Sequence, residues 1–83
     1  MKKTLKNTVN FAPNPASNNI SISNPTQLDL EYTIVDLLGK TVIKNTKTTA
    51  TNQPINLESL KSGVYLLQIN NNGNTITKKL VKQ

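Results

Sequence analysis

Apolar and polar side chains alternate at a period of two along several short stretches of this chain, which is the pattern of β-strands that bury one face. The clearest stretch covers residues 28–36, and its apolar side chains share one face: Leu28, Leu30, Tyr32 and Ile34. Acidic and hydroxyl side chains occupy the other face: Asp29, Glu31 and Thr33. This pattern predicts a strand with one buried and one solvated face.

The last stretch, residues 60–83, predicts a β-hairpin that ends almost at the terminal carboxylate. The apolar side chains of its first strand share a face: Tyr65, Leu67 and Ile69. Ile76 and Leu80 share a face of its second strand. Asn72-Gly73 lies between the strands, and both residue types tolerate the positive φ of a tight turn. Because chain ends usually fray unless a sheet holds them, a strand here indicates an end that is structural or is recognised by a partner.

Asp36, Gly39 and Lys40 mark the connection that follows residues 28–36. The Asp36 carboxylate can accept hydrogen bonds from backbone N–H groups ahead of it, and Gly39 can take a left-handed conformation at little cost. The apolar residues 41–44 follow at hairpin distance, so we expect these two strands to pair antiparallel. The other expected elements are short: a strand at 20–23, a loop or weak edge strand at 45–53, a strand at 54–57 and a turn or single helical turn at 58–63 that Gly63 closes.

Six or seven short strands, with turn residues about every 8–12 positions and no long helical pattern, predict an all-β fold. We expect a small immunoglobulin-like antiparallel β-sandwich of about seven short strands. With 83 residues the chain is long enough for one domain, which we assign to residues 11–83, with residues 1–10 as a basic linker or tail. Pro13-Asn14-Pro15 restricts the backbone twice and belongs at an edge or corner of a sheet.

The residue types present argue against an enzyme. The chain has neither Cys nor His, so the usual general bases, nucleophiles and transition-metal ligands are missing. Asp29 and Glu31 share a strand face, but a calcium site needs about six to eight oxygen ligands. Asp36 and Glu58 fall in predicted turns that explain them. We therefore expect no catalytic residue, no metal site and no cofactor.

The formal net charge of +6 belongs to the two ends of the chain. The terminal lysines are Lys2, Lys3, Lys6, Lys78, Lys79 and Lys82, whereas the charges between residues 7 and 77 cancel. Nucleic-acid readers favour Arg and stacking aromatics, and this chain has no Arg and only three aromatic residues, so we expect no nucleic-acid partner. No apolar run is long enough for a transmembrane segment, and no apolar signal-peptide segment follows the first lysines.

Four sequence motifs, in this order and at this spacing, resemble those of one known family. They are Pro13-Asn14-Pro15-Ala16, then Asp36 with Gly39-Lys40, then Leu57 through Leu60 to Gly63-Val64-Tyr65, and finally Lys79-Leu80-Val81-Lys82. From about Phe11 to Gln83, the chain is similar to the type A C-terminal sorting domain of type IX secretion cargo in Bacteroidetes. It departs from the family pattern at Ala12, where the family often has an aromatic residue.

The resemblance implies a function and a set of partners. Such a domain is the C-terminal part of a larger precursor with its own N-terminal signal, and it directs the N-terminally fused cargo through the periplasm to the outer-membrane surface or extracellular space. The implied partners are an outer-membrane secretion translocon, a shuttle protein and a sortase-like cysteine peptidase. That peptidase removes the domain or exchanges it for a surface anchor. The last strand, with Lys79, Leu80 and Val81, is the part that the resemblance implicates most directly in recognition.

Structural explanations stand beside these functional ones. Pro13-Asn14-Pro15 also serves as a rigid corner, Asp36 and Gly39 as turn residues, and Tyr65 as a core aromatic whose hydroxyl finds a partner. Lysines on an edge strand also deter aggregation, and an exposed last strand could pair with a second copy. We expect the last strand to dock to its partner by strand addition and residues 80–83 to be dispensable for folding. The alternative function is an adhesion or carbohydrate-binding module, which needs exposed aromatic side chains for sugar stacking.

Overall fold

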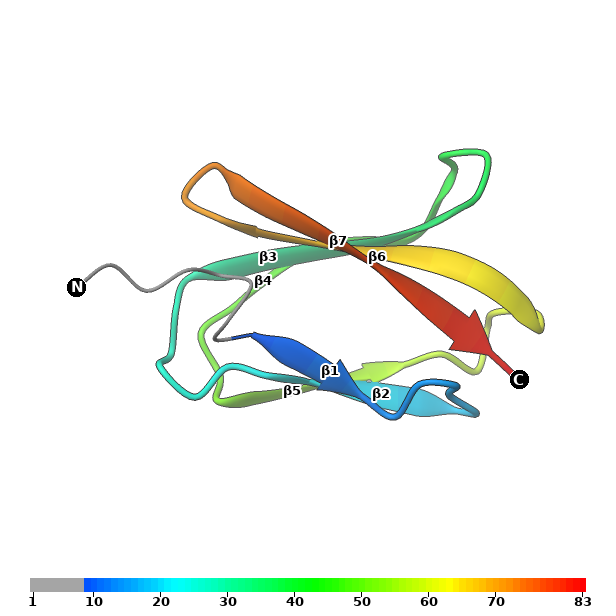
Figure 1. Cartoon of the computed structure of the whole chain (residues 1–83), viewed down its shortest axis with the longest axis horizontal. Helices are drawn as coiled ribbons and strands as arrows, with labels where there is room; N and C mark the ends of the chain where they lie inside the picture. The colour runs from blue at the N-terminus through cyan, green and yellow to red at the C-terminus, as the bar shows by residue number, and fades with distance from the viewer. Residues whose placement is uncertain (1–8) are drawn as a thin grey trace.

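The computed structural model describes residues 9–83, which form a sandwich of two antiparallel sheets (Figure 1). Seven strands follow one another along the described chain: β1 (Asn10–Ala12), β2 (Asn19–Ser23), β3 (Leu30–Asp36), β4 (Thr41–Thr48), β5 (Asn52–Asn56), β6 (Gly63–Asn71) and β7 (Asn74–Lys82). The three-stranded sheet has the order β1-β2-β5 and the four-stranded sheet the order β4-β3-β6-β7. This arrangement confirms the predicted all-β, immunoglobulin-like sandwich.

The hydrophobic core lies between the two sheets and is built by the alternation seen in the sequence. The inward-facing side chains of β3 and β6 are buried, namely Leu30, Tyr32, Ile34, Tyr65, Leu67 and Ile69. They meet Ile20, Ile22 and Ile55 from the opposite sheet. Leu80 of β7 is fully buried in the same cluster. The last strand is therefore part of the core and not an appendage.

Local turn chemistry explains two of the hairpins. Asn72 and Gly73 have φ values of 50° and 88°, which is the left-handed pair that a two-residue hairpin turn requires. The turn joins Asn71 to its partner Asn74 and fixes the register of β6 and β7. In the β3–β4 hairpin, Gly39 takes a φ of 87°. Both turns lie where the sequence predicts them.

The structure decides between two alternatives that the sequence prediction leaves open. The sequence predicts a loop or weak edge strand over residues 45–53, and β4 continues as an edge strand to Thr48, since β3 supplies it with a partner and β-bulges absorb the mismatch in register. The loop is limited to the segment between β4 and β5. Residues 58–60 form the predicted turn, closed by the Leu60 N–H and the Leu57 carbonyl (2.9 Å), and Gly63 begins β6 instead of closing the turn.

The folded part begins slightly earlier than expected. Val9 is buried in the core and Asn10 opens β1, so the end of the predicted linker belongs to the sandwich. Residues 1–8, which carry Lys2, Lys3 and Lys6, lie outside the described residues. After β1, the peptide bonds that precede Pro13 and Pro15 are both cis, and the chain passes from the edge of the three-stranded sheet to the edge of the four-stranded one.

Asn24 organises the connection between β2 and β3, a role that the sequence analysis missed. Its side chain is fully buried. Its Oδ1 accepts a hydrogen bond from the Leu28 N–H (3.0 Å) and its Nδ2 donates one to the Leu28 carbonyl (2.9 Å). The Asn24 amide thus provides hydrogen-bond partners for both backbone groups of Leu28, which lies between β2 and β3 and has no strand partner.

Candidate partner-recognition site at the carboxyl end

The sequence-predicted site residues come from distant parts of the chain, and strand pairing brings them together at one end of the sandwich. Asp36 pairs with Tyr65, Tyr65 with Leu80, and Gly63 with Lys82. A bridge also joins Ala16 to Lys82. We call this region the carboxyl end and define it as residues 13–16, 36–40, 63–65 and 79–83. It lies at the end of the molecule opposite Asn10, where β1 begins (Figure 1).

Asn14 clamps the outer edge of β7. Its Nδ2 donates a hydrogen bond to the Lys79 carbonyl (3.1 Å), and its Oδ1 accepts one from the Val81 N–H (3.0 Å). The primary amide thus bonds two backbone groups of β7 in the way that a neighbouring strand would. Pro13 and Pro15 flank it and fix the φ angles on either side.

Ala16 continues the same edge through its backbone. Its N–H donates to the Val81 carbonyl (2.8 Å), and its carbonyl accepts from the Gln83 N–H (2.7 Å). Its side chain is buried. The Pro13–Ala16 segment therefore covers the carboxyl half of the outer edge of β7, which the sequence analysis expected to be free.

The Asp36 motif is a turn built on one carboxylate. Oδ1 of Asp36 accepts hydrogen bonds from the Leu38 N–H and the Lys40 N–H, both at 2.9 Å. The Asp36 backbone also bonds to Gly39 and Lys40. The carboxylate is thereby committed to the turn, as the structural explanation of this motif expected.

Tyr65 supports the start of β6. It is buried, and its hydroxyl donates a hydrogen bond to the Lys61 carbonyl at 2.7 Å. A tyrosine near the start of this strand that bonds a few residues upstream is a hallmark of immunoglobulin-like sandwiches. Tyr65 is therefore structural, and the cations of the carboxyl end are Lys40, Lys79 and Lys82.

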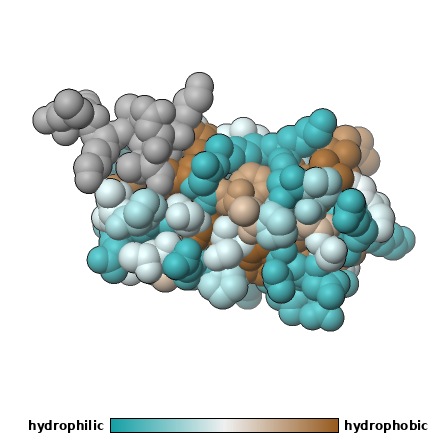
Figure 2. Space-filling view, turned by 60° about the horizontal axis from the view of Figure 1, so that its bottom comes forward, coloured by the Kyte–Doolittle hydropathy of each residue, from teal (hydrophilic) through white to brown (hydrophobic). Residues whose placement is uncertain are grey.

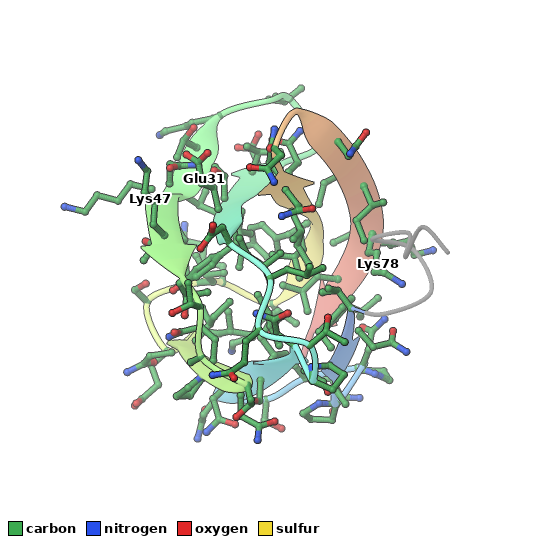
Figure 3. The ribbon with its side chains drawn as sticks, turned by 90° about the vertical axis from the view of Figure 1, so that its left-hand side faces the viewer. Glu31, Lys47 and Lys78 are labelled. Carbon is green, nitrogen blue, oxygen red and sulfur yellow. The ribbon has the colours of Figure 1, made fainter. Side chains whose placement is uncertain are left out.

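The lysines of the last strand do not act as one group. Lys79 is exposed on the outer face of the four-stranded sheet, whereas Lys78 turns toward β1 and contacts Asn10 Oδ1 at 3.4 Å. Lys82 lies at the end of β7 and donates to the Gln83 backbone oxygen at 3.0 Å. Figure 3 shows Lys78 on the side of the molecule opposite Lys47.

The acidic pair on β3 lies away from this site. Glu31 pairs with Lys47 across β3 and β4, and the two side chains lie side by side in Figure 3. They line an open depression of about 510 Å³ together with Asp29 and Asn70. Within residues 9–83 no three metal-ligating side chains come together, and no helix of this part of the chain is long and apolar enough to cross a membrane.

The aromatic side chains offer no platform for sugar stacking. Tyr32 and Tyr65 are both buried, and Phe11 is half-buried against the core. These are all the aromatic residues in the sequence. The carbohydrate-binding alternative therefore lacks the exposed rings on which it depends.

A seven-stranded immunoglobulin-like sandwich whose last strand packs into the core, and whose motifs meet at the carboxyl end, defines a small β module. The model of the secretion system C-terminal sorting domain matches residues 10–83. The chain belongs to this family of type IX secretion sorting domains, which confirms the resemblance found in the motifs. It is a C-terminal sorting signal for export to the cell surface or extracellular space.

One relative is a much longer protein that matches this chain over a small part of its length. The endo-acting ulvan lyase of Formosa agariphila is 38% identical to this chain over 78 residues. The match covers 93% of this chain but only 15% of the lyase. The chain thus spans about 15% of the length of the relative it matches.

Proposed function

We propose that the carboxyl end is the face by which outer-membrane export machinery recognises this domain and the cargo fused in front of it. The observation that supports the proposal is the convergence of four separate motifs at one end of the sandwich. Turn formation and core packing account for Asp36, Gly39 and Tyr65 individually. They do not require Lys40, Lys79 and Lys82 to share one end, and this grouping of cations supports a partner with an acidic surface.

The geometry also favours this end because of where the cargo attaches. Asn10 begins β1 at the opposite end of the sandwich (Figure 1). A cargo domain that precedes residue 10 therefore leaves the carboxyl end open to a partner. A translocon component or shuttle protein could then bind the carboxyl end while the cargo remains attached at the opposite end of the domain.

Strand addition remains our proposed mode of docking, with a narrower location. Alternate residues of β7 point their backbone groups away from β6, and Asn14 and Ala16 already bond those of Lys79, Val81 and Gln83. Among residues 9–83, none provides a backbone partner for the outward groups of Thr75 and Thr77. A partner strand that docks at the carboxyl end would therefore have to displace Asn14 and Ala16, whereas the Thr75–Thr77 edge, toward the β6–β7 turn, can be paired without displacing them. The same edge could pair with a second copy, and this dimer remains a prediction.

The last step of the proposed function is removal of the domain by a sortase-like peptidase, which releases the cargo or exchanges the domain for a surface anchor. The start of β1 at Asn10 and the burial of Val9 support a cut before the sandwich, because folded strands resist peptidases. The lyase relative carries this domain as 15% of its length, so we propose that the cargo is a larger protein of this kind, such as a polysaccharide-degrading enzyme.

The test is an export assay with charge-reversed variants. The chain is fused behind a periplasmically targeted fluorescent protein in a bacterium with type IX secretion. Lys79→Glu/Lys82→Glu should trap the reporter in the periplasm, whereas the control Lys44→Glu/Lys47→Glu on edge strand β4 should export normally. An antibody against the chain should not detect it on exported reporter. Equal export of both variants would contradict recognition at the carboxyl end, and an intact extracellular fusion would contradict removal.

A further inference from the structure

The outer face of the four-stranded sheet is divided into a polar half and an apolar half. The solvated half carries polar outward side chains: Glu31, Thr33, Gln68, Asn70 and Thr77. The half next to the carboxyl end carries aliphatic ones instead. Val35 pairs with Leu66, and Val64 pairs with Val81, all on the face opposite the core.

Val35 shows that this apolar half is more than scattered surface residues. It is only 7% exposed, yet it does not belong to the core cluster between the sheets. Its cross-strand partner on the outer face is Leu66, so its low exposure indicates a small apolar cluster on the side of the sheet that sequence alternation predicts to be solvated. The other sandwich layer lies on the opposite side of this sheet (Figure 1).

Exposed leucines extend this cluster to the β3–β4 turn. Leu37 is 64% exposed, Leu38 95% and Val64 36%, and these are the exposed large hydrophobic residues of the described chain. All three lie at the carboxyl end. Figure 2, which brings the three-stranded sheet forward, shows brown atoms at the right-hand end as well as in the middle of the surface and beside the grey atoms. We call the set Val35, Leu37, Leu38, Val64, Leu66 and Val81 the apolar patch.

The fold does not require the two leucines. The Asp36 carboxylate closes the turn through the backbone N–H groups of residues 38 and 40, and Gly39 supplies the positive φ. Any polar residue at positions 37 and 38 would serve this turn, and polar residues are what exposed turns usually carry. Exposed apolar side chains that gather at one end of a molecule indicate an interaction site.

The charges around the patch indicate what covers it. Lys79 stands on the same face beside Leu66, Lys40 follows the leucines, and Lys82 ends the strand that carries Val81. The Asp36 carboxylate is committed to its turn. Lys82 alternates to the side of Leu80 and bonds to the Gln83 oxygen, so Lys79 and Lys40 are the cations beside the patch. A second copy of this chain is disfavoured as the occupant, because two copies would bring their lysines together. A cargo fused before Asn10 is disfavoured as well, because it attaches at the opposite end of the sandwich. An aliphatic protein surface with acidic residues around it complements both the apolar side chains of the patch and the lysines beside it.

We propose that the apolar patch is a docking surface for a protein of the export machinery that presents aliphatic side chains ringed by Asp and Glu. This inference rests on the proposed function and adds Leu37 and Leu38, which lie between the motif residues Asp36 and Gly39, to the recognition surface. Docking buries the leucines under the partner while the lysines pair with acids at the rim of the contact.

The test compares the same reporter fusion in four forms. Leu37→Ser/Leu38→Ser should lower the exported fraction at least about tenfold, since two apolar anchors are lost. Leu38→Ser alone should lower it by a smaller factor. Leu37→Met/Leu38→Met should stay within about twofold of wild type, because the apolar area is kept. The thermal midpoint of the isolated chain should be the same in all four forms, since both side chains are exposed.

The possible failures are distinguishable. Normal export of the serine variants beside an exported wild type would overturn the patch and leave the proposed function standing. A wild-type fusion that is not exported would overturn both. A separate experiment tests a lipid partner by sedimenting the wild-type chain with vesicles of phosphatidylglycerol and phosphatidylcholine. If the wild type binds and Leu37→Ser/Leu38→Ser abolishes this binding, the patch is assigned to a membrane surface and the protein partner is overturned. If the wild type stays in the supernatant, the protein partner is supported.

Discussion

At the scale of single residues, amide side chains hold the irregular parts of this chain in place. Asn24 bonds both backbone groups of Leu28 from a fully buried position, and Asn14 bonds two backbone groups of β7 from an exposed one. Asn can do this because its side chain presents one donor and one acceptor, like a peptide group. An ionised Asp can only accept, and Ser has its donor and its acceptor on a single oxygen, so neither can replace the amide.

The buried amide gives the first prediction. Asn24→Ala leaves the Leu28 N–H and carbonyl without partners in the interior, so the free energy of unfolding should fall by about 2–3 kcal/mol. Urea unfolding followed by circular dichroism measures this change. Asn71→Ala is the control: it removes an exposed bond from Nδ2 to the Asp29 carbonyl, and should cost less than about 1 kcal/mol. Equal losses in the two variants would contradict the role given to Asn24.

The residues that could be predicted from the sequence are those whose roles are local. Asp36, Gly39 and the Asn72-Gly73 pair act within their own turns, and each was placed correctly. The roles of Asn14 and Val35 depend on β7 and β6, which lie far away in the chain. Alternation placed Val35 on a solvated face, and only the register with Leu66 shows why it is buried.

At the scale of elements, the last strand is held on both edges over its carboxyl half. β6 pairs with it along its whole length, and residues 14–16 close its outer edge. The amino half has only β6 beside it among residues 9–83. The outer edge of β7 is thus bonded in its carboxyl half and more accessible in its amino half, near the hairpin turn.

This arrangement gives the second prediction. Asn14→Ala removes two hydrogen bonds to β7, so the amide of Val81 should exchange with solvent about five- to tenfold faster. The Leu67 amide, in the centre of the same sheet, should change far less. Hydrogen exchange followed by nuclear magnetic resonance resolves both amides. An unchanged Val81 rate would show that Ala16 alone holds this edge.

The periodicity of the sequence predicts where most strands lie, but not how long each strand is or in which order the strands pair. Alternation located β3, β6 and β7 because one face of each enters the core. β4 carries polar side chains beyond residue 44 and is a strand because β3 pairs with it. Pro54 lies within β5, which is possible because β5 is the edge of its sheet. The three-plus-four division of strands depends on non-local pairing, which no periodicity encodes.

At the scale of the whole molecule, the carboxyl terminus contributes to stability as well as to the proposed recognition site. Residues 80–83 include the fully buried Leu80 and the partners of Tyr65, Val64 and Gly63. We expected these residues to be dispensable for folding, and their burial argues against that expectation. A domain this small has a stability of only about 5–10 kcal/mol, and losing a buried leucine alone costs about 2–5 kcal/mol.

The third prediction follows from this reasoning. Deletion of residues 80–83 should unfold the domain or lower its thermal midpoint by more than about 10 °C, as measured by circular dichroism. Lys79→Gln/Lys82→Gln should leave the midpoint nearly unchanged, because both side chains lie outside the core. A truncated chain that melts like wild type would contradict the structural role of the last strand. Loss of export on truncation therefore tests folding as much as recognition.

The most direct test of the central claim, that this chain is a sorting signal, compares one fusion in two strains. A periplasmically targeted fluorescent protein carries the chain at its C-terminus, and the fraction of fluorescence outside the outer membrane is measured. Export in a strain with an intact type IX translocon, together with periplasmic retention in an isogenic strain without it, is the result we predict. The same extracellular fraction in both strains would contradict the claim.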